Sequence, residues 1–212
     1  MITMNQPQAF GTFLLTEKNT FRTSAFIQWG DSKKSLGSCL LLNPGSAHLN
    51  KNIPDTELST MNEIPQRIQT DPTMKQVIKL VQCIYHSEDV IEGRLHIFNL
   101  FNLQDATSVS AIEKFENLVN NKEYNVNCHL TSIEDLRTHP WILLGWSLQR
   151  NTRWVNLEEA KRLWRVRIAE SGIPVFGKQD PVSRNYYHPN PHLHSKKTEI
   201  LKELTILHSE MH

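Results

Sequence analysis

Four short polar motifs in this chain each follow a short apolar run, and their side chains could do chemistry. The motifs are Asn43-Pro44-Gly45-Ser46, Asn99-Leu100-Phe101-Asn102, Gly145-Trp146-Ser147 and His188-Pro189-Asn190-Pro191. Amides donate and accept hydrogen bonds, and an imidazole can donate to a phosphate or to developing negative charge. Ligands bind outside the carboxyl ends of strands in open α/β sheets, so we expect the motifs to form one composite site.

The first two motifs supply amides suited to a planar polar ligand. Pro44 rigidifies the exit from the strand and Gly45 permits close approach of the backbone, so the Asn43 amide is held at the sheet edge. Asn99 offers a second amide that could hydrogen-bond a base edge. The alternative is that both motifs are turns selected for shape alone.

The fourth motif opens a segment with three imidazoles, His188, His192 and His194. Prolines break their spacing, and no cysteine or carboxylate stands beside them to complete a metal site. We therefore predict neither a metal nor a cofactor. A rigid loop in which one imidazole donates a hydrogen bond is the favoured interpretation.

Apolar runs alternate with helix-like segments, which is typical of βα units in a mainly parallel sheet. We expect strands over 38–42, 95–98, 141–144 and 173–176, and an added edge strand over 21–30. We expect helices over 72–86, 110–120, 156–171 and 195–208, with Asp71, Asn156 and Gly172 as helix ends. The chain of 212 residues should form a single domain, 1–212. The polar stretch 47–70 is long for a connection and could cover the site.

The composition indicates a soluble protein. No apolar stretch approaches the roughly 20 residues that cross a bilayer, and residues 1–8 lack the pattern of a secretory leader, so we expect a cytoplasmic location and no membrane partner. The three cysteines, Cys39, Cys83 and Cys128, have no metal-like spacing, and we expect structural core thiols.

Positive charge is concentrated in the last third of the chain. Residues 141–198 hold ten Lys or Arg and four Asp or Glu, although the whole chain has a formal charge of +1. This excess suits a phosphate-bearing partner such as nucleic acid. A solvated helix face over 161–167 is the alternative explanation.

The order of several motifs resembles the bacterial and phage family called domain of unknown function 1643. The similar segments are Arg22 to Trp29, Leu40 to Ala47, Asp71-Pro72-Thr73 and Asn99-Leu100-Phe101. The resemblance spans most of the chain. That family has no settled activity, so the resemblance leaves function open.

A more distant resemblance is to the uracil-DNA glycosylase superfamily. Its members order an acidic or Asn-Pro turn, a strand ending in Asn, a strand ending in Trp-Gly and a His-Pro-Ser-Pro loop, and the four motifs here are similar in that order, with Gly145 and Trp146 exchanged. The resemblance implies a three-layer α/β/α fold around a four-stranded parallel sheet. It also implies a pocket for a base extruded from DNA.

The second resemblance implies roles for individual residues. Asn43 would position the attacking water and His188 would support the leaving base anion. Base contacts would come from Asn99, Pro44, Gly45 and a stacking ring of Phe101 or Trp146. DNA contacts would come from Ser46, Arg184, Pro189, Asn190, Pro191, His192, Leu193 and Lys196, with Leu193 as the duplex plug.

Two departures from that superfamily shape the functional prediction. The stretch 47–70 has no aromatic residue to stack on a base, and Asn43 is not a general base. We therefore predict a DNA glycosylase-like protein that recognises a modified or mismatched base, with weak or selective excision. The alternative is a catalytically silent nucleotide- or nucleic-acid-binding module. A hydrolase using Ser46 or Ser147 is disfavoured, because neither lies in a Gly-x-Ser-x-Gly elbow.

Overall fold

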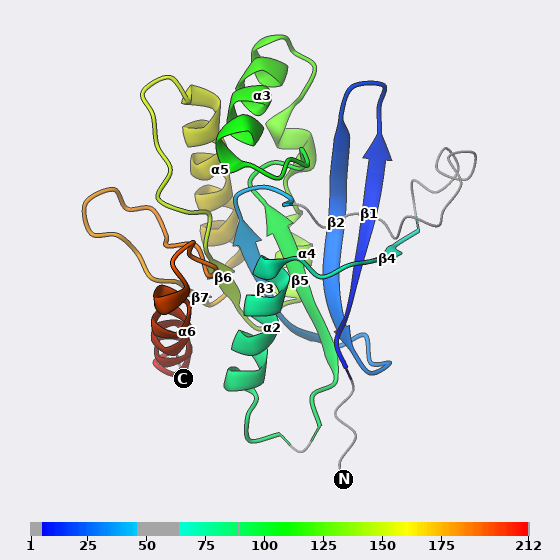
Figure 1. Cartoon of the computed structure of the whole chain (residues 1–212), viewed down its shortest axis with the longest axis vertical. Coiled ribbons are helices and arrows are strands. Elements are labelled where there is room, and N and C mark those ends of the chain that lie inside the picture. Colours follow the sequence, from blue (N-terminus) through cyan, green and yellow to red (C-terminus); the bar gives the residue numbers. More distant parts are fainter. Residues whose placement is uncertain (1–5, 46–63, 89, 212) are drawn as a thin grey trace.

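The computed structural model describes residues 6–45, 64–88 and 90–211. The strands are β1 (Gln8–Leu15), β2 (Thr20–Trp29), β3 (Ser35–Leu41), β4 (Gln66–Ile68), β5 (Gly93–Asn99), β6 (Ile142–Leu144) and β7 (Val175–Phe176). The helices are α2 (Pro72–Ile84), α3 (Ser108–Asn120), the 3-10 turn η1 (Val126–His129), α4 (Ile133–Arg137), α5 (Val155–Ser171) and α6 (His194–Ser209). The strands form one mixed sheet in the order β4-β1-β2-β5-β3-β6-β7, with helices on both faces (Figure 1).

One half of the sheet is parallel. β5, β3, β6 and β7 pair in parallel, and each overlaps one of the four apolar runs expected to be strands. Because the chain leaves these strands at the same edge, the loops after them gather there. This half therefore brings the polar motifs together.

The other half of the sheet corrects the expectation of four strands with one added edge strand. β2 lies inside the sheet, antiparallel to both β1 and β5, and β4 adds to the far side of β1. β1 and β2 form a hairpin closed by a turn in which Thr16 N–H donates to the Asn19 carbonyl oxygen (2.9 Å). The class is thus α/β with a seven-stranded mixed sheet in the described residues.

The helix ends follow their local chemistry. Asp71 caps α2, because its Oδ1 accepts from Met74 N–H (2.8 Å), and Pro72 occupies the first turn. Gly172 ends α5 with φ +68°. The expected cap at Asn156 is wrong by two residues. Trp154 holds the cap position, and Asn156 Nδ2 instead donates to Glu116 Oε2 (2.8 Å).

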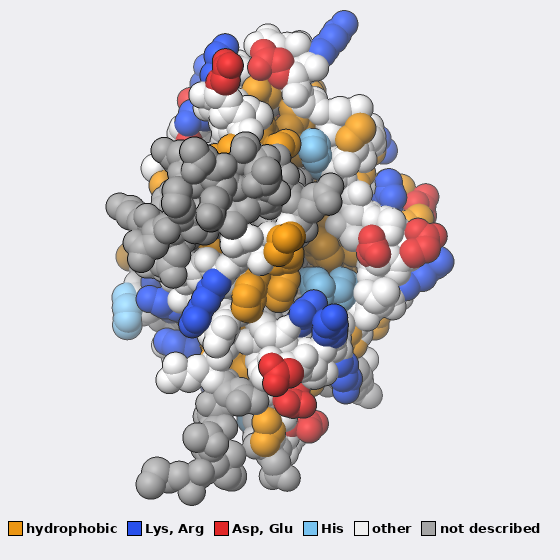
Figure 2. Space-filling view, turned by 90° about the vertical axis from the view of Figure 1, so that its right-hand side faces the viewer, with side chains coloured by type: hydrophobic (Ala, Val, Ile, Leu, Met, Phe, Trp, Pro, Cys, Tyr) orange, Lys and Arg blue, Asp and Glu red, His pale blue; other side chains and the backbone are white. Residues whose placement is uncertain are grey.

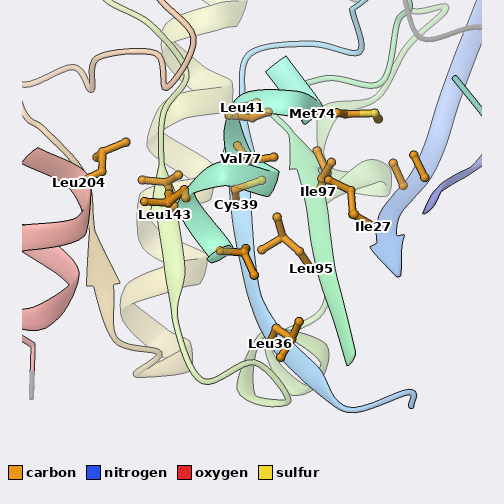
Figure 3. Packing of buried hydrophobic residues seen from close by; sticks show 14 of the residues in the cluster. Ile27, Leu36, Cys39, Leu41, Met74, Val77, Leu95, Ile97, Leu143 and Leu204 are labelled. Atoms are coloured by element: carbon orange, nitrogen blue, oxygen red, sulfur yellow. The ribbon is translucent and has the colours of Figure 1, made fainter. Parts of the chain in front are cut away.

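Two apolar layers cover the sheet. One packs α2 and α6 against β3, β5 and β6, and the other packs α3 and α5 against the opposite face. Figure 3 shows Leu41, Met74 and Ile97 in the first layer, close to where α2 begins. Cys39 is buried in this layer, whereas Cys128 is exposed, so the expectation of core thiols is wrong for Cys128.

The surface shown in Figure 2 has mixed charge. Lys and Arg side chains lie among Asp and Glu side chains, and apolar and histidine side chains gather near the middle of this face. The basic residues therefore do not segregate into one patch on this side of the molecule.

Candidate functional site

A cleft of about 1140 Å³ lies beside the carboxyl ends of the parallel strands. Its lining comes from segments far apart in the chain, which include Asn43 after β3, Thr107 after β5, Gln149 after β6 and His188 after β7. Asp71 and Thr73 at the start of α2 also line it. The structure thus brings residues from all the parallel strands to one cavity.

The Asn43 turn forms one wall. Asn43 Nδ2 donates to the carbonyl oxygens of Pro44 (2.9 Å) and Asp105 (3.1 Å), so both amide hydrogens are used and only Oδ1 is left for a ligand or water. Gly45 permits close approach, because a Cβ there would lie 3.1 Å from Asp71 Oδ2. The Asn-Pro-Gly turn therefore packs directly against the carboxylate that caps α2.

Asp71 supplies a carboxylate that the sequence indicated only as a helix cap. Its Oδ1 accepts from Met74 N–H, while Oδ2 faces Gly45 and the cleft. The carboxylate acts electrostatically on both Arg22 and His188, raising the pKa of each against the larger effect of burial. Asp71 is thus the acidic group between two basic side chains of the site.

Asp105, the other cleft carboxylate, is structural. Burial raises its pKa, but hydrogen bonds from Lys114, Thr107 and Ser110 outweigh burial and hold the pKa well below its ordinary value. Its oxygens are saturated by these donors, which also fix the start of α3. Asp105 is therefore an ionised anchor with no capacity left to accept a proton.

Arg22 at the depth of the cleft is the main residue that sequence reasoning missed. It points from β2 onto the face covered by α2, is 4% exposed, and lines the cleft with the apolar side chains of Leu41, Ile97 and Met74. Its Nη2 donates to Asn99 Oδ1 (3.1 Å). Asn99 thus lies beneath Arg22 and reaches the site through it.

The His188 loop forms another wall of the cleft. His188 Nδ1 lies 3.2 Å from both the amide nitrogen and the carbonyl oxygen of Asn190, which leaves Nε2 for a ligand. Burial lowers the pKa of His188, so the imidazole is neutral at pH 7. The loop packs against the end of β6, because a Cβ at Gly145 would lie 2.7 Å from Pro189 Cδ. Gly145 is therefore required for this wall.

The two expected stacking rings lie elsewhere. Phe101 is fully buried and stacks on Phe115, with ring centroids 4.3 Å apart. Trp146 is also fully buried, and its Nε1 donates to Asn185 Oδ1 (3.1 Å). Because both rings pack in the layer under α3 and α5, neither face is available to a base, and this corrects the expectation. Among the described residues, Trp154 is the aromatic side chain that lines the cleft.

The expected DNA contacts lie in different places. Asn190, Pro191 and His192 line the cleft, and Pro189 is buried, as is Pro44, which was expected to contact the base. Leu193, 67% exposed, precedes α6 at the surface. Lys196 pairs with Glu199 (2.7 Å), and Arg184 is exposed with φ +59°. Ser46 lies outside the described residues.

Three further observations bear on function. Within the described ranges, no cluster of three or more His, Cys, Asp or Glu side chains could hold a metal ion. The same part of the chain contains no helix with the length and apolar character needed to span a membrane. Comparisons with protein families, curated proteins and solved structures find no significant match. The function must therefore be argued from the cleft itself.

Proposed function

We propose that this cleft recognises a nucleobase of DNA and hydrolyses its N-glycosidic bond, as a DNA glycosylase does. The observation that carries the proposal is the convergence of Asn43, Asp71, Arg22 and His188 on one cavity at the carboxyl edge of the sheet. This set combines acceptors that can hold a water with donors that can hold a planar polar group. The proposed fold relationship to the uracil-DNA glycosylase superfamily is in line with this arrangement.

The acceptors would act on the water. Asn43 Oδ1 and Asp71 Oδ2 lie on the same wall, and in the described residues neither oxygen has a hydrogen-bond partner. The water oxygen would bond to C1′ of the sugar while Asp71 accepts a proton from it. This role for Asp71 replaces the weaker expectation in which Asn43 acts alone.

The donors would act on the base. As the N-glycosidic bond breaks, the base leaves with the bonding electron pair and becomes an anion. The buried guanidinium of Arg22 and Nε2 of His188 could stabilise that charge, and preorganised donors in a water-poor site are effective at this. Trp154 is the remaining ring for stacking, which is worth about 1–3 kcal/mol per base.

Oligonucleotide cleavage tests the proposal. Duplexes and single strands containing uracil, hydroxymethylated or glucosylated pyrimidines, or mismatches are incubated with the protein and then treated with alkali, and we expect strand breaks at one class of base. Asp71→Asn should abolish cleavage and retain binding, because Asn caps a helix as well as Asp does. Asp31→Asn, at an exposed turn, is the control and should cleave normally. Absence of both cleavage and salt-sensitive binding would refute the proposal.

A catalytically silent nucleotide-binding module is the second candidate. The observation that favours it is the burial of Phe101 and Trp146, which leaves the cleft poorer in stacking rings than expected for base extrusion. Binding of DNA or nucleotides by the wild type, with no product from any substrate, would support this candidate over the first.

A further inference from the structure

Arg22 is a buried cation whose hydrogen-bonding capacity is mostly unused. A guanidinium has five N–H groups, and one of them, on Nη2, donates to Asn99. Nε and Nη1 are buried and have no hydrogen-bond partner in the described part of the chain. Buried polar groups are almost always satisfied in native proteins, so these donors require an explanation.

Neighbouring groups compensate the charge only partly. Asp71 acts on Arg22 electrostatically, but across the described ranges no carboxylate lies within 4 Å of the guanidinium. Burial lowers the pKa of Arg22 to about 10 and raises the pKa of Cys39, the other titratable group that acts on Arg22, to about 12. At pH 7 Arg22 is therefore charged and Cys39 is neutral. A cation held in this state is a poor structural element.

Asn99 makes the pair rich in donors. Its acceptor, Oδ1, already accepts from Arg22 and keeps one lone pair, and its Nδ2 is buried without a partner among the described residues. The backbone holds the two together as well, because Arg22 N–H donates to the Asn102 carbonyl oxygen (2.9 Å). The motif 99–102 therefore positions the guanidinium instead of reading a ligand through a free amide.

We propose that Arg22 and Asn99 form a buried subsite for an anionic group that only accepts hydrogen bonds. This inference rests on the proposed function for the ligand being a nucleobase or nucleotide, and it deepens that function by naming the chemistry selected. A free amide reads a donor and an acceptor on a base, such as N3–H and O4 of uracil. In this pair the unpaired groups are donors and Oδ1 is already engaged, so it favours the oxygens and deprotonated nitrogen of an oxo-base anion, or the oxygens of a phosphate.

The position of the subsite favours the base anion. Leu41, Ile97 and Met74 line the same cleft as Arg22, and an apolar lining suits a planar ring with delocalised charge. In a glycosylase reaction this anion is the leaving group. The pair would then stabilise the negative charge that develops on the base in the transition state more than it stabilises the neutral base of the substrate, which is the condition for accelerating the reaction.

Thermal unfolding with added ligands tests the subsite. The ligands are uracil, the more acidic 5-fluorouracil, cytosine, and inorganic phosphate against chloride of equal ionic strength. We expect 5-fluorouracil at pH 8 to raise Tm by roughly 5–10 °C at a hundred times its Kd, uracil to require higher concentrations, and cytosine to have no effect. A shift by phosphate alone would assign the subsite to the phosphate source of the same chemistry.

Arg22→Met separates a ligand-binding role from a structural one. It removes the buried charge, so we expect a Tm a few degrees higher without ligand and no response to any anion. Arg22→Lys keeps the charge without the planar fork and should respond at least tenfold more weakly. Arg94→Met is the matched control on β5, since Arg94 is satisfied by Gln28 and Phe26, and it should respond like the wild type.

The outcomes separate this inference from the proposed function. An anion response that requires Arg22, in a protein that neither binds nor cleaves DNA, would support the subsite and refute the glycosylase proposal. Cleavage that persists in Arg22→Met would refute the subsite alone. A lower Tm for ligand-free Arg22→Met with an unchanged anion response would also overturn it, because Arg22 would then be structural.

Discussion

Two buried cations in this protein, Arg22 and Lys161, are treated in opposite ways. The Lys161 side chain is 0% exposed, and its Nζ donates to the Gln149 carbonyl oxygen (2.9 Å) and to Glu158 Oε1 (2.7 Å). Arg22 is equally enclosed but uses one of its donors. Burial alone therefore does not mark a functional charge. The unused donors of Arg22 indicate a function, because buried donors without a partner destabilise a protein and are expected to be satisfied by a ligand or another partner.

Lys161 stabilises residues that line the same cleft. It fixes Gln149, whose Nε2 donates to Ser108 Oγ (2.7 Å) at the start of α3. Gln149 and Ser108 both line the cleft. The satisfied cation thus holds the wall in place, and the unsatisfied one faces the space that the wall encloses.

Of the variants that test this comparison, a replacement of Lys161 should change the free energy of unfolding most. Lys161→Met leaves the Gln149 carbonyl without its partner, and we expect a loss of about 2 kcal/mol in the free energy of unfolding. The corresponding fall in Tm is about 4–8 °C. Urea unfolding measures the change, and its sign should be opposite to that of Arg22→Met.

Arg162→Met is the matched control for Lys161. Arg162 lies next to it on α5 and pairs with Glu159 through an exposed ion pair, which is worth little. We expect no measurable change in the free energy of unfolding. Equal losses at 161 and 162 would contradict the distinction between a buried crosslink and a surface pair.

Gly145→Ala should disturb the cleft wall that carries His188. The added Cβ would lie 2.7 Å from Pro189 Cδ, so the loop must shift, at a cost of about 2 kcal/mol and with loss of the ligand-induced rise in Tm. Gly172→Ala is the control. It strains a left-handed backbone in open space, costs about 1 kcal/mol, and should leave the ligand response intact. If both variants keep the response, the His188 loop is not part of the binding site.

The parallel half of the fold could be predicted because its signals are local. Four short apolar runs become strands, and Asp71-Pro72 marks the start of α2 by its own capping chemistry. The sequence predicts a strand over 21–30, which β2 confirms, but not its hairpin partner β1, although the polar turn 16–19 between two mixed runs was a usable signal. Pairing of β2 inside the sheet depends on β5, which lies far along the chain.

The site could be predicted only in outline. The motifs place Asn43 and His188 correctly at one edge, since strand ends determine where loops begin. They mislead for Phe101 and Trp146, because a residue just after a strand can point into the helix layer as easily as into a cleft. Arg22 could not be found, because its importance lies in the hydrogen bonds it lacks, and missing partners leave no pattern in a sequence.

The smallest expected effect is on the pH dependence of the free energy of unfolding. Replacing a buried histidine should change this dependence, and replacing Arg22 should not. At the amino end of the parallel strands, burial lowers the pKa of His139 to about 4 and also lowers that of His96. Below pH 6.5 these two histidines become protonated in the unfolded chain, whereas in the folded protein they stay neutral until the pH is lower. The free energy of unfolding should therefore fall as pH drops from about 6.5 toward 4, and His188 adds to the fall in the same direction.

His139→Gln should flatten this pH profile by about 1 kcal/mol between pH 6.5 and 4.5, after allowance for solvent screening. Glutamine can still bond Ser35 Oγ, which lies 2.7 Å from His139 Nδ1. Arg22 stays charged across this range, so Arg22→Met should give a profile parallel to the wild type and displaced upward. A slope changed by Arg22→Met would mean that the guanidinium is coupled to the protonation of His188 across Asp71, and the cleft would then titrate as one unit.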